Sequence, residues 1–343
     1  QPGNDADPYT HTVSPGLTLV LGPHVTADYS ASIRFYSEKD FHNTVDHSFS
    51  LHAGYNVGDW TLGLSQSASI SDEPTVATSS QVQQSDYNTG LLASYSMSDK
   101  ATLATSASMG LSYNGGGTTS TNIFVGGTNG PAAQLTDSKD YNLTETFDYK
   151  FNDKLSGGVS ASLGYTDQAG GFRSIEENYS VHVGWHPAEK FSATLSGGLE
   201  QRNFLDSKTT SSWSPIYSAN IGYQMFEQTA LSVYASRSLD ASMFTRQLSE
   251  TTAVGAGLQQ RLLGRIQLSL GFGYTKVDYE STATTDLSKS RGDDSTSFTA
   301  GITMPFLTRC SFAAFYQYSQ NQSSQAGFSF DSNQVGATLS WAY

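Results

Sequence analysis

The sequence predicts an all-β protein, a transmembrane antiparallel β-barrel of 16–18 strands, because of three observations. Apolar and small polar residues alternate at every second position along most of the chain. The connections between the alternating segments are short and long in turn, and aromatic residues gather at the segment ends. Together these features are typical of barrels that cross an outer membrane, with short periplasmic turns and long extracellular loops.

The alternation is clearest in KLSGGVSASLGYTD at 154–167, FSATLSGGLEQR at 191–202 and RIQLSLGFGYT at 265–275. In the first of these, Leu163 and Tyr165 fall on one face, and serine and glycine fill the other. A period of two places alternate residues on opposite faces of a strand. A soluble sandwich carries charged residues on its outer face. Here the second face is mostly Ser, Gly, Thr, Asn and Gln, as in a barrel with a lipid-facing band and a polar lumen.

The composition excludes several classes of protein. The 343 residues carry a formal net charge of −13, 14% of them are charged and 12% are aromatic. The aromatic content argues against disorder, and the acidity argues against nucleic acid as a partner, since phosphate binding needs clustered Lys and Arg. No apolar run approaches the roughly 18 residues that a membrane helix needs. The single cysteine, Cys310, can form neither an intrachain disulfide nor a CxxC site.

Short turns and long loops alternate from segment to segment. The short connections are 56–59, 97–100, 151–154, 186–190, 226–229, 262–265 and 305–309. The long polar connections are 37–44, 71–81, 114–137, 167–177, 206–212, 240–247, 280–294 and 319–332. Trp60 and Trp185 fall near short turns, whereas Tyr141 and Trp213 fall near long loops. This distribution predicts an aromatic girdle at each membrane interface.

The number of strands is odd. Sixteen can be counted between His24 and Tyr343, and one further alternating segment, residues 9–21, makes seventeen. We therefore assign the barrel to residues 24–343 and expect residues 1–23 to be an N-terminal segment that forms either an extra strand or a plug. Bacterial single-chain barrels have even counts, so we favour an eighteen-stranded barrel whose first strand precedes Gln1. Pro15 suits an edge strand or a bulge, because proline cannot donate to a strand ladder.

Three stretches, SPGLTLVLGPHVTADYSASIRFY, DHSFSLHAGY and SDEP, resemble the β-barrel porin family found beside exopolysaccharide-export loci. The resemblance covers most of the chain. It implies a barrel in the bacterial outer membrane and a pore for sugars or secreted polysaccharide, with no catalytic residues to carry over. The chain end, with Leu339, Trp341 and Tyr343 on one face, also looks like the signal that the barrel assembly machinery reads.

If the apolar face meets lipid, the alternate positions line the lumen. Charged residues and histidines in that register are Asp28, Arg34, His52, Asp148, Lys150, His182, Glu200 and Arg202. Mixed charges across a lumen can select solutes, or they can form a hydrogen-bonded network that fills the barrel, and the sequence leaves both alternatives open. The longest connection, from Asn114 to Asp137, could fold inward as a constriction or remain an external loop.

The sequence predicts no enzymatic site. His42, His47 and His52 recur every five residues, so successive ones fall on opposite faces of a strand and cannot converge on a metal. No GxSxG elbow marks a hydrolase. We therefore expect no metal site, no cofactor and no enzymatic activity.

Four polar residues interrupt the lipid-facing register on consecutive strands: Gln66, Thr89, Thr105 and Glu145. A charge at the middle of the lipid face is unfavourable, so the four residues predict a contact between protomers of a homo-oligomer. The alternative is a β-bulge that turns Glu145 toward the lumen.

The preferred function is an outer-membrane porin-like channel for passive passage of small polar solutes or for export of polysaccharide. The alternative is a structural or interaction barrel whose extracellular loops bind a surface polymer, an appendage or a partner protein. In either case the expected partners are outer-membrane lipid, lipopolysaccharide bridged by divalent ions to the acidic loops, and the barrel assembly machinery. A polysaccharide-export partner is a further expectation.

Overall fold

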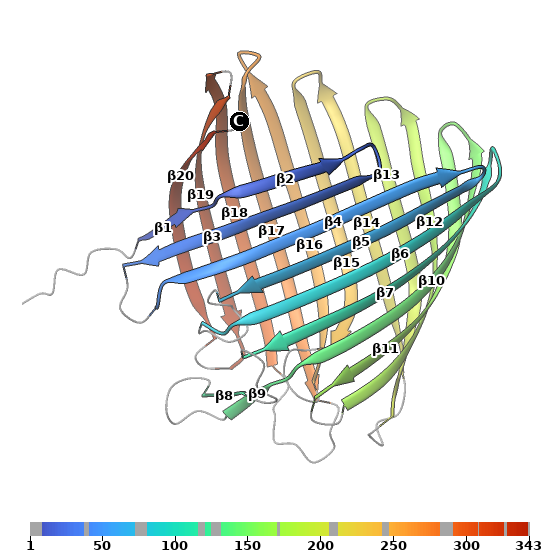
Figure 1. Cartoon of the computed structure of the whole chain (residues 1–343), viewed down its shortest axis with the longest axis horizontal. Coiled ribbons are helices and arrows are strands. Elements are labelled where there is room, and N and C mark those ends of the chain that lie inside the picture. The colour runs from blue at the N-terminus through green and yellow to red at the C-terminus, as the bar shows by residue number, and fades with distance from the viewer. Residues whose placement is uncertain are drawn as a thin grey trace, which may run out of the picture.

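The computed structural model is a β-barrel wall built from one antiparallel sheet (Figure 1). It describes residues 9–37, 41–72, 81–115, 121–124, 132–169, 172–205, 212–241, 247–281, 291–307, 309–325 and 328–341. Tyr343 of the predicted assembly signal lies outside these ranges, as does much of the predicted 114–137 loop. The described residues contain no helix that could cross a membrane.

Most strands run for 12 to 17 residues. Their bounds are β1 Thr10–Val13, β2 Gly16–Leu21, β3 Val25–Tyr36, β4 Thr44–Val57, β5 Trp60–Ser71, β6 Gln84–Ser98, β7 Ala101–Asn114, β8 Thr121–Phe124, β9 Ala132–Leu135, β10 Ser138–Asn152, β11 Leu155–Gln168, β12 Phe172–Ala188, β13 Phe191–Phe204, β14 Ser212–Phe226, β15 Thr229–Ala241, β16 Gln247–Leu262, β17 Ile266–Ser281, β18 Arg291–Leu307, β19 Cys310–Ser323 and β20 Phe330–Trp341. At about 3.3 Å per residue, the longer strands reach well past the hydrocarbon thickness of a bilayer.

The sheet is a succession of hairpins. From β3 to β20 each strand pairs antiparallel with the next, except that β7 pairs with β10 because the small β8–β9 hairpin intervenes. Eighteen strand segments belong to the main sheet. Two of them, β1 and β2, pair with successive parts of β3. The sheet therefore has seventeen strand positions, which confirms the prediction of seventeen alternating segments in an antiparallel barrel.

Pro15 separates β1 from β2. It has no backbone N–H, but its carbonyl oxygen accepts a hydrogen bond of 3.0 Å from the backbone nitrogen of Ala31 in β3. Because β1 and β2 lie at the edge of the sheet, the missing donor of Pro15 breaks no ladder on the other side. Residues 10–21 are thus part of the sheet, broken in the middle.

Burial identifies the outer face of the barrel. Side chains on a convex face diverge and stay exposed, whereas those on a concave face crowd together. Large apolar side chains in one register are widely exposed, among them Val159, Val181 and Leu195. Polar side chains in the other register are buried: Thr44, Asp46, Asn114, Thr166, Gln168, Ser174, Glu200, Arg202, Arg291, Asp293 and Asn321. The apolar face is therefore the outer one, as a wall surrounded by lipid requires.

The described residues bury few hydrophobic side chains. The buried ones are Ala31, Val82, Ala193, Leu248 and Phe328. A soluble protein of this length would bury a large apolar core. Here the apolar area is stabilised only if lipid covers it, so the structure favours a membrane barrel over a soluble sandwich.

Two neighbouring glycines of β13 provide a test of how closely the strands pack. A Cβ atom on Gly198 would overlap the carbonyl oxygen of Tyr179 and lie 2.8 Å from the Cα atom of Ser180. A Cβ atom on Gly197 would meet nothing within 4 Å. We expect Gly198→Ala to lower the free energy of unfolding by about 1–3 kcal/mol, the usual effect of overpacking. Gly197→Ala, the control, should leave it nearly unchanged. Urea unfolding of the refolded barrel, followed by tryptophan fluorescence, measures both, and equal effects would contradict the close approach at Gly198.

Candidate functional site

The inner face of the barrel is lined mainly by small hydroxyl side chains and glycine. Serine hydroxyl groups on neighbouring strands form hydrogen bonds with each other, 2.7 Å long between Ser160 and Ser180 and 2.8 Å long between Ser196 and Ser218. The lining is therefore polar without being bulky. A barrel of this strand number encloses an aqueous channel unless something fills it.

The strand registers place all eight predicted lumen residues on this inner face. They are Asp28, Arg34, His52, Asp148, Lys150, His182, Glu200 and Arg202. Asp148 bonds to His182 and Glu200 bonds to Arg202, so these four predicted residues meet one another. Asp28, Arg34 and Lys150 instead bond to residues outside the predicted set.

Asp148 and His182 meet although their strands are not adjacent. The Oδ1 atom of Asp148 on β10 lies 2.6 Å from Nε2 of His182 on β12. Between them on β11 is Gly158, which pairs with both residues. A Cβ atom at Gly158 would lie 2.6 Å from the imidazole ring. The missing side chain of this glycine is what allows the two side chains to join across an intervening strand.

Arg202 is the centre of a buried cluster near the long-loop end. Its Nη2 atom lies 3.0 Å from a carboxylate oxygen of Glu176 and 3.0 Å from one of Glu200. The same nitrogen donates a 3.0 Å hydrogen bond to the carbonyl oxygen of Leu239 on β15. The β14–β15 ladder ends at Tyr217, and Pro215, two residues further, has no N–H to donate. Arg202 thus supplies a donor to a carbonyl near the point where the ladder stops.

The other inner-face residues have shorter-range partners. Arg34 forms an ion pair with Asp46. Asp28 accepts a 2.6 Å hydrogen bond from Thr18, and Lys150 lies 3.0 Å from Asp153 in the adjacent short turn. His52 stands opposite Thr26 of β3 and Ser65 of β5.

A second buried cluster was not predicted. The guanidinium of Arg291 bonds the Asp293 carboxylate at 2.6 Å and stacks on two rings, 4.4 Å from the centre of Tyr279 and 3.9 Å from that of Phe328. Asn321 donates a 2.8 Å hydrogen bond to the carbonyl oxygen of Phe328. Arg291 and Asp293 are two residues apart and therefore share the inner face of β18, whereas the ring of Phe328 could not be foreseen because it comes from a long loop. Asp46 and Glu176 were missed as well, although both follow the inner-face alternation.

The four polar residues predicted on the lipid-facing register do lie on the outer face. Gln66 is opposite Thr89, and Thr105 is opposite Glu145. The Thr105 hydroxyl lies 2.8 and 2.9 Å from the two carboxylate oxygens of Glu145. The ladders on both sides of β10 run through Glu145 without a register shift. The alternative of a bulge that turns Glu145 inward is therefore wrong, while the protomer contact stays a prediction.

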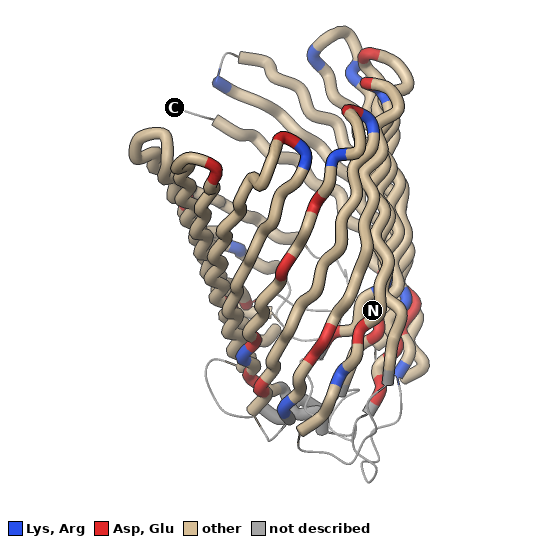
Figure 2. Tube along the Cα trace, turned by 90° about the vertical axis from the view of Figure 1, so that its right-hand side faces the viewer, with Lys and Arg blue, Asp and Glu red and all other residues tan. Residues whose placement is uncertain are grey.

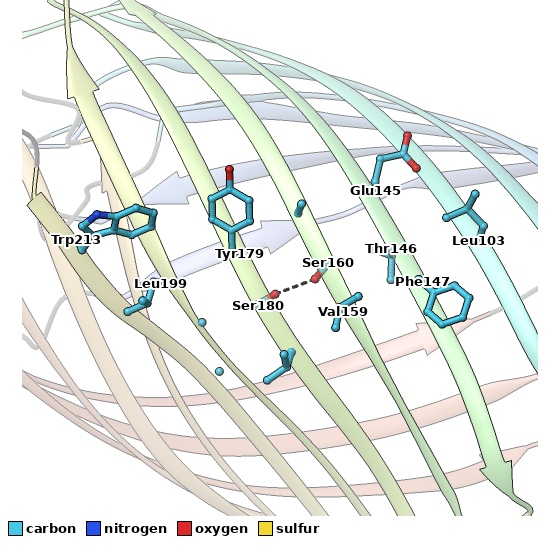
Figure 3. A pocket seen from close by; sticks show the side chains of 14 residues that line it. Leu103, Glu145, Thr146, Phe147, Val159, Ser160, Tyr179, Ser180, Leu199 and Trp213 are labelled. Atoms are coloured by element: carbon cyan, nitrogen blue, oxygen red, sulfur yellow. Dashed lines mark hydrogen bonds between the residues drawn. The ribbon is translucent and has the colours of Figure 1, made fainter.

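Glu145 borders a shallow depression of ≈ 690 Å³ on this outer face (Figure 3). Its rim carries large apolar side chains, including Phe147, Tyr179 and Trp213. The small residues Ala161 and Gly197 lie among them and leave the space open. Of the four residues of the predicted protomer contact, Glu145 lies at the edge of this concave apolar surface.

Charged residues gather toward the two ends of the barrel, and few lie midway along it (Figure 2). This is the distribution expected when the middle of the wall faces hydrocarbon, because charges on the lipid face are most costly at the bilayer midplane. Fold, apolar outer surface and polar inner surface together define a transmembrane β-barrel.

The chain belongs to the family described as "Putative beta-barrel porin 2", which matches residues 12–343. This match confirms the predicted resemblance to a β-barrel porin family. No curated protein sequence matches the chain.

Solved structures share the fold at low sequence identity. The FrpB iron transporter of Neisseria meningitidis (F5-1 variant, apoprotein form) superposes with a TM-score of 0.58 at 11% identity, over 98% of this chain and 65% of FrpB. The copper transporter OprC gives 0.56 at 10% identity, over 97% of this chain and 65% of OprC. The siderophore receptor PirA of Acinetobacter baumannii gives 0.52 at 9% identity, over 99% and 72%. The chain therefore spans 65% of FrpB, and the likeness concerns the fold. Family and fold together indicate an outer-membrane barrel channel.

The Arg202 cluster yields a stability prediction. Arg202→Met would leave the Glu176 and Glu200 carboxylates without their shared cation, and removing one partner of a buried ion pair costs about 3–5 kcal/mol. Adding Glu176→Gln and Glu200→Gln should recover most of the lost free energy of unfolding. The control is Arg237→Met, whose pair with Glu250 is about a quarter exposed and should be worth at most about 1 kcal/mol. Urea unfolding decides, and a loss no larger for Arg202 than for Arg237 would contradict the buried cluster.

Proposed function

We propose that the protein is a passive outer-membrane pore for small polar solutes, with a preference for cations. The observation that carries the proposal is the inner face, which is polar, made of small side chains and richer in acidic than in basic residues. Solutes would cross by passive diffusion through water, and passage would require neither a cofactor nor a covalent bond to the protein.

The cation preference follows from how the inner-face charges are paired. Arg34, Arg202 and Arg291 are each bonded to carboxylates, so their positive charges are largely neutralised locally. The carboxylates of Asp140 and Asp240 face inward as well, and they accept hydrogen bonds from hydroxyl groups of threonine and serine. A lumen lined by net negative charge concentrates cations and repels anions.

Support for a water-filled path comes from the described segments of the chain. Among the described strands, only β8 and β9 lie outside the main sheet, and they pair with each other. Apart from His52, the predicted lumen residues bond to partners on the same or nearby strands or in an adjacent turn, close to the wall. Their contacts favour a lining over a network that fills the barrel.

Export of polysaccharide would use the same lumen, and hydroxyl-rich walls suit sugar hydroxyls by hydrogen bonding. That substrate comes from the family resemblance rather than from any particular residue. The interaction barrel is the opposite alternative, because it requires a closed lumen.

Conductance across a planar bilayer tests the pore. In a KCl gradient we expect stepwise channels with a cation-selective reversal potential, weaker at high salt because screening shortens the reach of the charges. The double variant Asp140→Asn with Asp240→Asn should lower the cation-to-anion permeability ratio by about twofold or more. Asp331→Asn removes a carboxylate of the outer face and is the matched control, with an unchanged ratio expected. Absence of channels at any voltage would exclude the pore and favour the interaction barrel.

A further inference from the structure

Two large aromatic side chains stand on the inner face of the barrel, among small hydroxyl residues. Tyr234 of β15 is in the inner register, directly opposite Asn220 of β14. Phe315 of β19 is in the inner register as well, opposite Gly336 of β20. Both aromatic side chains are 42% exposed. In a membrane barrel, exposed aromatic rings belong to the interface girdles and the lipid face, so these two rings on the lumen side are an exception.

Each of the two rings lies on a glycine of the next strand. A Cβ atom on Gly255 of β16 would overlap the Tyr234 ring and lie 2.6 Å from its hydroxyl oxygen. A Cβ atom on Gly273 of β17 would lie 3.5 Å from the same oxygen, so the Tyr234 side chain extends along the wall across two strands. A Cβ atom on Gly336 would likewise overlap the Phe315 ring. One face of each ring therefore covers backbone, and the other face is turned to the lumen.

The two rings lie at a similar depth in the barrel. The strands β15 and β19 both begin at the short-turn end, and Tyr234 comes five residues after Thr229, as Phe315 comes five residues after Cys310. At about 3.3 Å per residue, each ring is about 16 Å along its strand, close to the middle of a wall that spans a bilayer. A solute that crosses the lumen along this side therefore meets the two rings at about the same level.

The side of the lumen that carries the two rings is uncharged over most of its height. On the inner face of β14 to β20, the charged residues that the structure describes lie within three residues of a strand end: Asp240, Arg261, Arg291 and Asp293. The eight predicted lumen residues all lie on β3 to β13 instead. In Figure 1, β14 to β18 form the far wall behind β3 to β7. The lumen thus has a charged side and an uncharged side.

Polar groups that can bond a solute stand beside each ring. Asn220 is directly opposite Tyr234, and Gln317 is two residues from Phe315 and opposite Gln334 of β20. The Tyr234 hydroxyl and the side-chain amides of Asn220 and Gln317 form no hydrogen bond with another residue of the described ranges. An amide group both donates and accepts hydrogen bonds. Each exposed ring face is therefore bordered by an uncharged group that can bond a hydroxyl.

We propose that Tyr234 and Phe315 form a binding surface for neutral sugars in the lumen. The inference rests on the proposed pore and names a class of solute for it. A pyranose ring has a face of C–H groups that stacks on an aromatic ring, and hydroxyl groups at its edge that match the neighbouring amides. A charged solute finds no complementary charge midway along this side, and an open-chain solute has no flat face to stack.

Block of the ion current by a sugar tests the binding surface. When maltose is added to single channels in KCl, we expect the current to fall saturably with maltose concentration, because a bound sugar obstructs the lumen. Sorbitol has similar hydroxyl groups but no ring, and it should lower the current only in proportion to the viscosity of the solution. Glucuronate, a sugar ring with a carboxylate, should block less than maltose, because the lumen repels anions.

Substitutions that keep apolar bulk but remove a ring face locate the site. Tyr234→Leu and Phe315→Leu should each raise the maltose concentration for half-maximal block by about two- to tenfold, the effect of one aromatic contact. Tyr234→Phe keeps the ring and should retain most of the block. Tyr217→Leu removes a ring of the outer face that is similarly exposed, at 43%, and as the matched control should leave the block unchanged. Urea unfolding checks that each variant is folded.

Two results would overturn the sugar site while the pore itself stood. One is an equal effect of maltose and sorbitol on channels that conduct. The other is undiminished block by maltose in the double variant Tyr234→Leu with Phe315→Leu, which would mean that the sugar binds elsewhere.

If no channels form, the proposed pore fails, and the site is measured without conductance. Saturation-transfer NMR on the refolded barrel then reports whether maltose contacts the protein. Transfer that is lost in the double variant and kept in Tyr217→Leu supports the site. Absence of transfer to maltose, or transfer that the double variant keeps, overturns it.

Discussion

The backbone hydrogen bond in a medium without water is the interaction on which this structure depends. Every N–H and C=O group within the bilayer needs a partner from the protein, and a closed antiparallel sheet provides one for each. The long strands, the hairpin order and the separation of apolar and polar residues to two faces all follow from that requirement. The inside-out burial, with polar side chains buried and apolar ones exposed, is its most direct result.

Small and ring-constrained residues determine which polar groups can meet on the inner face. Gly158 lets Asp148 and His182 join across β11, and Pro215 lies where the Leu239 carbonyl receives the Arg202 guanidinium instead of a ladder bond. In both places the absence of an atom, a Cβ or an N–H, creates the contact. The lining is consequently held by local pairs close to the wall, and its remaining carboxylates give the lumen its acidic character.

Sequence periodicity was enough to predict the strands, their faces and the seventeen positions, because a period of two is a local property of each strand. The lumen residues followed from the same parity. Their partners did not, since Asp148 meets His182 only through registers set over three strands. The cluster around Arg291 could not be predicted either, because its guanidinium stacks on the ring of Phe328, which comes from a distant loop. The suggested bulge at Glu145 was wrong, because the β7–β10 ladder runs through this residue without a register shift. The Glu145 carboxylate stays on the outer face and accepts a hydrogen bond from the Thr105 hydroxyl. Pro15 divides β1 from β2, which alternation alone does not reveal.

The hairpin order also has a consequence for the order of assembly. Almost every ladder joins strands that are neighbours along the chain, so each closes a loop of a few tens of residues. A ladder that closed the barrel would have to bring together strands from the two ends of the described chain, a loop roughly ten times longer. Loop-closure entropy grows by about 0.6 kcal/mol per doubling of loop length, so such a closing ladder would cost about 2 kcal/mol more than a hairpin. We therefore expect closure to be the last step of assembly and the first contact to open, because every other ladder of the wall is local.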